Sequence, residues 1–265
     1  MSALASILAA TDFSAPSRHA ADRAARLAHE TGASLTLMHT LPGAALAELR
    51  QWLGAHPGAE QQLRERARDQ LQQLAAELAA ARHAQVQPLL ASGSPIDEIV
   101  RQADAQDTDL LVLGARGTGF LRRLVLGTTS ERLLRRTTRP LLVVRQTPHE
   151  PYRRVLVALD FSPWSAQAVA MARRVAPHAQ LVLLSAFEVP FGEKLQFAGV
   201  DAATIELYRR QARTGATQRL HALAQAAGLR PTQYDACIVE GDASQRIVEQ
   251  EQELDCDLVV LGKHG

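Results

Sequence analysis

The segment Asp109–Gly117 reads "DLLVLGARG", and the segment Asp257–Gly265 reads "DLVVLGKHG", 148 positions later. Two further pairs keep the same offset: "ILAATDFSAPS" from Ile7 with "VLVALDFSPWS" from Val155, and "ASGSPIDEIV" from Ala91 with "VEGDASQRIV" from Val239. Three matches at one offset are the signature of an internal repeat. The sequence therefore predicts two copies of one domain.

Short apolar runs alternate with longer amphipathic stretches in the first copy. Runs such as "LLVLG" suit strands that are buried on both faces. Strands that alternate with helices predict a doubly wound α/β domain with a parallel sheet and right-handed crossovers. The expected strands are 4–10, 34–40, 85–91, 109–113 and 140–145, and the expected helices are 16–31, 60–83, 95–105 and 128–138. The alternative, a helical bundle, does not explain the punctuated β-like runs.

Pro148 and Pro151 interrupt regular structure between the two copies. We therefore expect a first domain at 1–147 and a second at 152–265. The second copy stops after the first half of the glycine motif, at Gly265. We expect this domain to be truncated, without the last helix and the fifth strand.

The composition excludes several classes of function. With 29 basic and 28 acidic residues the net charge is +1, and aromatic residues make up 4%, so nothing favours binding to nucleic acid. The sequence contains neither a signal peptide nor an apolar run long enough for a membrane span. Two cysteines, Cys237 and Cys256, are too few for a disulfide framework, so we expect a cytoplasmic protein with reduced thiols.

Four glycines follow the strand that is expected at 109–113: Gly114, Gly117, Gly119 and Gly127. Glycine lets a backbone turn tightly and approach a ligand without a Cβ atom in the way. The hydroxyls of Thr128 and Thr129 then stand where a helix begins, and a helix N-terminus favours a phosphate group. This strand–loop–helix context favours phosphate binding over a flexible turn that ends in a threonine cap.

Two charged residues that follow expected strands, Asp12 and Arg116, have two interpretations each. Asp12 follows the first strand as Asp160 does in the second copy. Its carboxylate can accept hydrogen bonds from a nucleoside, or it can serve at the start of a helix, where aspartate is favoured. Arg116 can neutralise phosphate charge, or it can be a solvated surface residue.

The spacing Gly114-x2-Gly117-x9-Gly127-Thr128 resembles the nucleotide-binding signature of the universal stress protein family, here in a tandem form. The "TDFS" after the first strand is also typical of that family, and the likeness covers nearly the whole chain. The resemblance implies a Rossmann-like fold of the adenine nucleotide alpha-hydrolase type. It also implies the strand order 3-2-1-4-5, with ATP, ADP or AMP bound between strands one and four.

The resemblance also implies roles for particular residues. Ala10 and Asp12 flank adenosine, and the backbone of Thr40 contacts the adenine edge. The remaining residues carried over are Leu113 and Gly114 beside adenine and ribose, and Gly117, Gly127, Thr128 and Thr129 around the phosphates, with Arg116 beside them. Mg²⁺ can accompany ATP, and no protein metal site is expected.

The predicted function is therefore an adenine-nucleotide-binding protein with a regulatory or stress-protective role, and not an enzyme. The loop 115–126 contains no Asp, Glu or His to act as a base or to hold a metal, which favours slow or absent hydrolysis. The alternatives are a slow ATPase or nucleotidyl-transfer enzyme on the same scaffold, and a structural pairing module that binds nothing. Dehydrogenase and Walker-type loops are absent from the sequence.

The family also implies an assembly. Its fifth strands commonly pair antiparallel, and the fifth strand of the first copy, Pro140–Val144, is an apolar edge strand in this interpretation. Unpaired apolar edges favour association. We therefore expect a homodimer that is joined through this strand.

Overall fold

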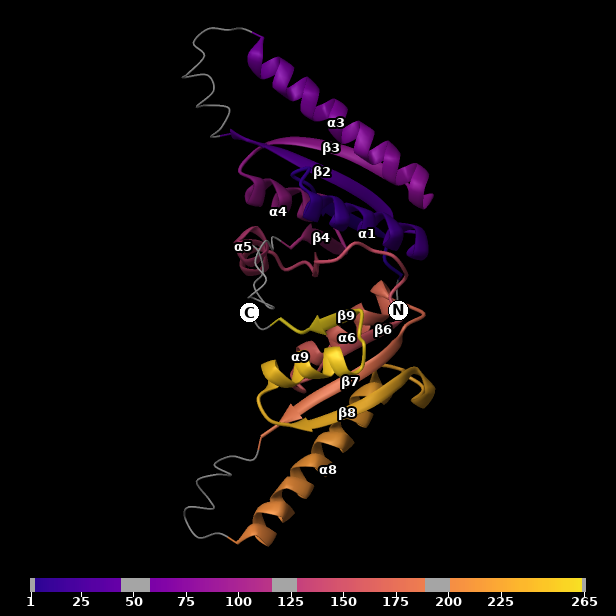
Figure 1. Cartoon of the computed structure of the whole chain (residues 1–265), viewed down its shortest axis with the longest axis vertical. Helices are drawn as coiled ribbons and strands as arrows, with labels where there is room; N and C mark the ends of the chain where they lie inside the picture. Colours follow the sequence, from indigo (N-terminus) through magenta and orange to yellow (C-terminus); the bar gives the residue numbers. More distant parts are fainter. Residues whose placement is uncertain (1–2, 44–57, 116–127, 189–200, 264–265) are drawn as a thin grey trace. The chain divides into compact units, whose positions relative to one another are not determined.

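Buried apolar runs form one parallel sheet in each half of the chain (Figure 1). The protein is represented by a computed structural model that describes residues 3–43, 58–115, 128–188 and 201–263. The chain divides into a first unit, Ser2–Pro151, and a second unit, Tyr152–Gly265. Within the described residues no helix has both the length and the apolar character that crossing a bilayer requires.

The first unit contains a five-stranded sheet of order β3-β2-β1-β4-β5, in which every neighbouring pair is parallel. The predicted doubly wound fold and its strand order are confirmed. The strands are β1 (Ser6–Ala10), β2 (Ser34–Pro42), β3 (Val86–Gly93), β4 (Leu110–Gly114) and β5 (Leu141–Val144).

Helices cover both faces of this sheet. On one face α1 (Ala15–Thr31) packs beside α3 (Ala59–Arg82), and on the other α4 (Pro95–Ala105) packs beside α5 (Thr128–Arg136). α1 begins at the cap residue Ser14, whose side chain accepts a hydrogen bond from the Ser17 amide, and it ends at Gly32 with φ 76°. Left-handed φ values favour glycine, so the helix stops there.

Alanines bring α1 close to the sheet. Ala20, Ala24 and Ala25 are fully buried, and α1 contacts both β1 and β4. On the opposite face larger side chains fill the core, among them Leu8 and Leu111, which are also fully buried. Burying one such side chain stabilises the fold by about 1.5–3 kcal/mol.

The second unit repeats this plan with a sheet of order β8-β7-β6-β9 in the part of the chain that is described. α6 and α8 cover one face of the sheet and α9 the other. The elements are β6 (Arg154–Ala158), α6 (Pro163–Val175), β7 (Gln180–Phe187), α8 (Ala202–Ala226), a 3-10 turn (Pro231–Gln233), β8 (Tyr234–Glu240), α9 (Ala243–Glu253) and β9 (Leu258–Leu261).

The repeated aspartate before β4 and β9 holds the start of the first strand in each unit. Asp109 Oδ2 accepts hydrogen bonds from the backbone amides of Ala5 (2.8 Å) and Ser6 (3.2 Å). Asp257 Oδ2 accepts the equivalent bonds from the amides of Arg153 and Arg154. This contact explains why both repeats of "DLxVLG" begin with aspartate.

Candidate functional site

The carboxyl ends of β1 and β4 lie side by side in the first sheet, where Ile7 pairs with Leu110 and Ala9 with Val112. From β1 the chain moves to β2 on one side, and from β4 it moves to β5 on the other. Such a reversal of strand order is where ligands bind in open α/β sheets. Asp12 follows β1 at this edge, and Gly114 ends β4.

The turn after β1 presents a charged carboxylate. Asp12 is exposed, and its Oδ1 accepts hydrogen bonds from the Ser14 amide (3.1 Å) and the Ser14 hydroxyl (2.5 Å). Partial burial acts to raise the pKa of Asp12, but hydrogen bonds from Ser14 and Ser17 outweigh it and hold the pKa below 3.8. Asp12 is therefore ionised at neutral pH, and a carboxylate has lone pairs left for a ligand.

Phe13 and His39 fix the shape of this turn. Phe13 has a φ of 63°, a value that non-glycine residues rarely adopt, and its amide donates to Thr11 Oγ1 at 3.0 Å. His39, on β2, lies with its ring centroid 4.3 Å from that of Phe13, and its Nδ1 is 2.7 Å from the Thr11 carbonyl oxygen. Because a carbonyl oxygen only accepts, Nδ1 of His39 carries the hydrogen.

The other residues predicted to line the site from the strands have side chains that are small or buried. Ala10 is the last residue of β1, and Thr40 on β2 is 9% exposed. Leu113 packs in the core with Leu133 of α5 and is 4% exposed. Contacts from Thr40 and Leu113 to a ligand at this edge would therefore come from the backbone.

Gly114 has a packing reason to be glycine. A Cβ atom at this position would lie 2.5 Å from the Pro16 carbonyl oxygen and 2.8 Å from the Ser17 amide nitrogen. No side chain fits there unless the first turn of α1 moves away from β4. The sequence predicts a close approach of a ligand at this glycine, and the structure shows in addition its contact with α1.

The predicted phosphate loop is described only at its end. Arg116, Gly117 and Gly127 lie outside the described residues. Thr128 is the first residue of α5, and Thr129 in the same turn is exposed. The first turn of α5 therefore contains both predicted hydroxyl residues, at a helix terminus that favours anions.

The universal stress protein family model matches residues 4–145 and 151–265. The chain belongs to the universal stress protein family.

Two relatives and one solved structure show how far this likeness extends. Universal stress protein YxiE of Bacillus subtilis is 29% identical over 144 residues, which are 52% of this chain and 97% of that protein. A universal stress protein of Mycobacterium tuberculosis is 28% identical over 193 residues, which are 70% of this chain and 61% of that protein. A universal stress protein from Archaeoglobus fulgidus matches in structure with a TM-score of 0.71 at 17% identity, over 96% of this chain and 85% of that chain.

The second universal stress protein repeat presents its aspartate differently. Asp160 Oδ1 accepts from the Ser162 amide (2.9 Å) and from the Ser165 hydroxyl (2.8 Å), and Phe161 again has a positive φ of 62°. The ring centroid of Phe161 lies 4.6 Å from the guanidinium carbon of Arg219 on α8, whereas the ring of Phe13 contacts His39 on β2.

Neither cysteine belongs to a cluster of potential metal ligands among the described residues. Among the described residues no group of three or more His, Cys, Asp or Glu could hold a metal ion. Neither Cys237 nor Cys256 is in a disulfide bond. Burial raises the pKa of the Cys256 thiol to about 11, so it stays protonated at neutral pH and acts as a core residue.

The roles of Phe13, His39 and Thr11 were not predicted from the sequence. The repeat of "DFS" in both copies was the available signal for Phe13. The contact with His39 depends on β2 lying beside β1, and it joins residues that are far apart in the sequence.

Proposed function

We propose that the first repeat binds an adenine nucleotide at the carboxyl edge of its sheet, and that this binding serves a regulatory or stress-protective role. The observation that carries the proposal is the ionised Asp12 carboxylate, held by Ser14 at the point between β1 and β4 where the strand order reverses. Membership in the universal stress protein family supports the same ligand class.

In this proposal Asp12 accepts a hydrogen bond from a ribose hydroxyl, and the backbone of Thr40 contacts the adenine edge. Ala10, Leu113 and Gly114 line adenosine with backbone and Cβ atoms. The family signature assigns the phosphates to Gly117, Gly127, Thr128 and Thr129, with Arg116 near them. Mg²⁺ would accompany ATP through the phosphate oxygens.

We further propose that nucleotide turnover is not the purpose of the site. The segment 115–126 contains no Asp, Glu or His, so it offers neither a base nor a metal ligand near the phosphates. An ATPase or a nucleotidyl-transfer enzyme on this scaffold is the alternative. Turnover above about 1 per second would favour that alternative.

We also propose that two chains pair through β5. In the described part of the first sheet, β5 is at the edge and pairs only with β4. Its sequence, "LLVV", is fully apolar, and an apolar edge strand is a template for pairing with another chain.

Titration calorimetry of the full chain with ATP, ADP and AMP tests the nucleotide proposal. We expect one nucleotide per chain, and we expect Asp12→Asn to weaken binding by about 10–100-fold, because a hydrogen bond to a charged group contributes about 1.5–3 kcal/mol. Asp160→Asn, the same change in the second repeat, is the matched control and should leave affinity unchanged. Absence of binding to all three nucleotides would refute the proposal.

A further inference from the structure

The segment that joins the two units is hydrogen-bonded to residues of α1. We call residues 147–150 the connecting segment. The Thr147 hydroxyl lies 3.1 Å from His19 Nε2. Arg26 Nη2 donates to the His149 carbonyl oxygen at 3.0 Å, and Arg23 Nη1 donates to the Glu150 carbonyl oxygen at 2.9 Å.

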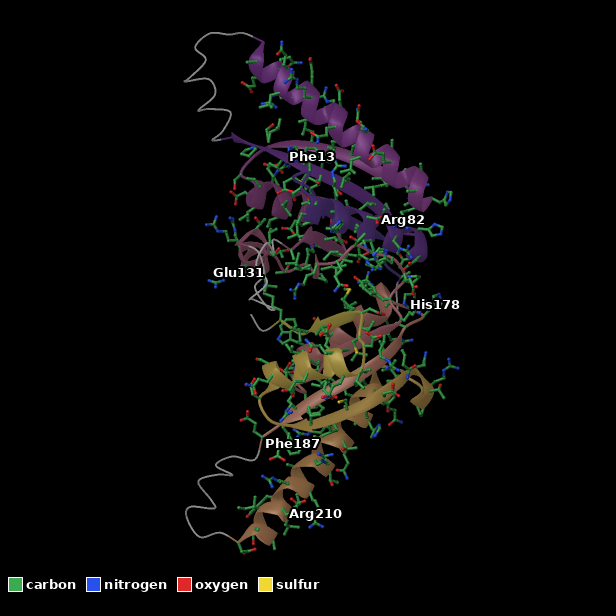
Figure 2. The ribbon with its side chains drawn as sticks, viewed as in Figure 1. Phe13, Arg82, Glu131, His178, Phe187 and Arg210 are labelled. Atoms are coloured by element: carbon green, nitrogen blue, oxygen red, sulfur yellow. The ribbon has the colours of Figure 1, made fainter. Side chains whose placement is uncertain are left out.

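A fourth contact comes from the end of α3, where Figure 2 labels Arg82. Arg82 Nη2 donates to the Pro148 carbonyl oxygen at 3.5 Å, while Nε and Nη2 hold the Asp22 carboxylate at 2.6 and 2.7 Å. The hydrogen bond with Asp22 raises the pKa of Arg82 and fixes its position. Pro148 itself is buried.

Arg23 of α1 is a buried charged residue that needs hydrogen-bond partners. Its side chain is buried, with 9% of the residue exposed. A buried guanidinium group is unfavourable unless it is hydrogen-bonded, and the Glu150 carbonyl oxygen is one of its partners. The connecting segment therefore contributes to the hydrogen bonding of a charge within the first unit.

The second repeat shows that these residues are not needed for packing a helix on the sheet. α6 keeps the buried alanines, since Ala168 and Ala172 stand where α1 has Ala20 and Ala24. Three positions of α1 that contact or support the connecting segment carry other residues in α6, whereas Arg26 is matched by Arg174. Gln167 replaces His19, Ala170 replaces Asp22 and Met171 replaces Arg23. His19, Asp22 and Arg23 therefore distinguish α1 from α6.

We infer that α1, with the end of α3, carries a docking site for the chain's own connecting segment. Docking shortens the part of the link between the two units that is not held by contacts. Glu150 is held by the first unit. Tyr152 already packs against the core of the second unit, and the Arg154 amide is bonded to Asp257. Pro151 stands between them, and its ring restricts φ to about −65°. Release of the connecting segment would lengthen the free link to residues 147–151.

The test is ¹⁵N relaxation of the His149 and Glu150 amides in the full chain. The triple variant His19→Gln, Asp22→Ala, Arg23→Met introduces the residues of the second repeat. We expect the order parameters of these amides to fall from about 0.85 in the wild type to below about 0.6 in the variant. The double variant Arg68→Met, Asp69→Ala removes the same two charges from exposed positions on α3 and should leave them unchanged.

Pro148→Gly tests the same contact from the other side. It removes the buried ring and leaves α1 intact, so it decides the question if the triple variant fails to fold. We expect the same loss of order at His149 and Glu150. Order parameters near 0.85 in the folded variants, or below 0.6 in the wild type, would overturn the inference.

Discussion

At the scale of single residues, one difference between the repeats changes how the same "DFS" motif is held. In the first repeat the Ser17 hydroxyl lies 3.0 Å from Thr11 Oγ1, and the Ser14 hydroxyl bonds to Asp12. The second repeat has Leu159 at the position of Thr11. Leucine offers no hydroxyl, and the Ser165 hydroxyl donates to Asp160. The Ser14 hydroxyl, which donates to Asp12, therefore has its counterpart in a serine hydroxyl of α6.

His39→Ser tests whether the ring on β2 positions Asp12. Ser185 occupies the equivalent place on β7, since Ala10 pairs with Met38 and Ala158 with Leu184, one residue earlier in each strand. The change removes a hydrogen bond and a ring contact, together about 1–2 kcal/mol, so we expect the dissociation constant for the nucleotide to rise about tenfold. His29→Ser is the control, because His29 lies near His83 at the other end of α1. Unchanged affinity in His39→Ser would contradict the role.

The pKa of Asp12 predicts how stability depends on acid. Because its pKa in the folded protein lies below the ordinary 3.8, the charge stabilises the fold above that value, and the stabilisation is lost as pH falls through the folded pKa. We expect the free energy of unfolding of wild type to exceed that of Asp12→Asn at pH 7, and the difference to shrink toward pH 3. Urea titrations of both proteins measure it. A difference independent of pH would show that the carboxylate charge is not involved.

At the scale of elements, apolar periodicity predicted the helices and strands of the first unit because each is stabilised by local pattern and burial. The errors lie at the ends. The helix predicted to reach Thr138 stops at Arg136, since Thr137 Oγ1 accepts the Arg139 amide and Pro140 follows. The strand predicted to end at Thr40 continues to Pro42, where it still pairs with β3.

Motif spacing predicted that Asp12 and Gly114 lie at the carboxyl edge of the sheet, but it did not predict what holds them there. The contact of Phe13 with His39 requires β2 beside β1. Residues 148–150 of the connecting segment are held through backbone carbonyl oxygens, which every residue possesses, so these contacts leave no sign in the sequence. Both lie in tertiary contacts that a local pattern does not contain.

Gly114→Ala tests the close approach of β4 and α1. The new Cβ atom would force backbone to move, and we expect a loss of stability of about 1–3 kcal/mol. Gly215→Ala is the matched control. Gly215 lies inside α8 with open space around its Cβ position, so alanine should stabilise the protein by about 0.5–1 kcal/mol. Denaturant midpoints measure both, and an unchanged midpoint for Gly114→Ala would mean that α1 adjusts freely.

At the scale of the whole molecule, the proposed dimer can be tested by a substitution in β5. The hydrogen bonds between β4 and β5 show which residues of β5 can be changed without breaking the sheet. The Leu111 amide donates to the Pro140 carbonyl oxygen, and the Ala115 amide to the Val144 carbonyl oxygen. In a parallel ladder alternate residues bond to the same neighbour, so residues 140, 142 and 144 face β4. The amides of Leu141 and Val143 therefore point away from β4, toward the free edge of the sheet.

Val143→Pro should separate the proposed dimer without disturbing the first sheet. Proline removes an outward amide and keeps the ladder to β4, and edge strands tolerate it. We expect light scattering to give a dimer for wild type and a monomer for Val143→Pro at the same concentration. Val143→Ala keeps the amide and should remain a dimer. A monomeric wild type, or a dimeric Val143→Pro, would mean that two chains do not pair through β5.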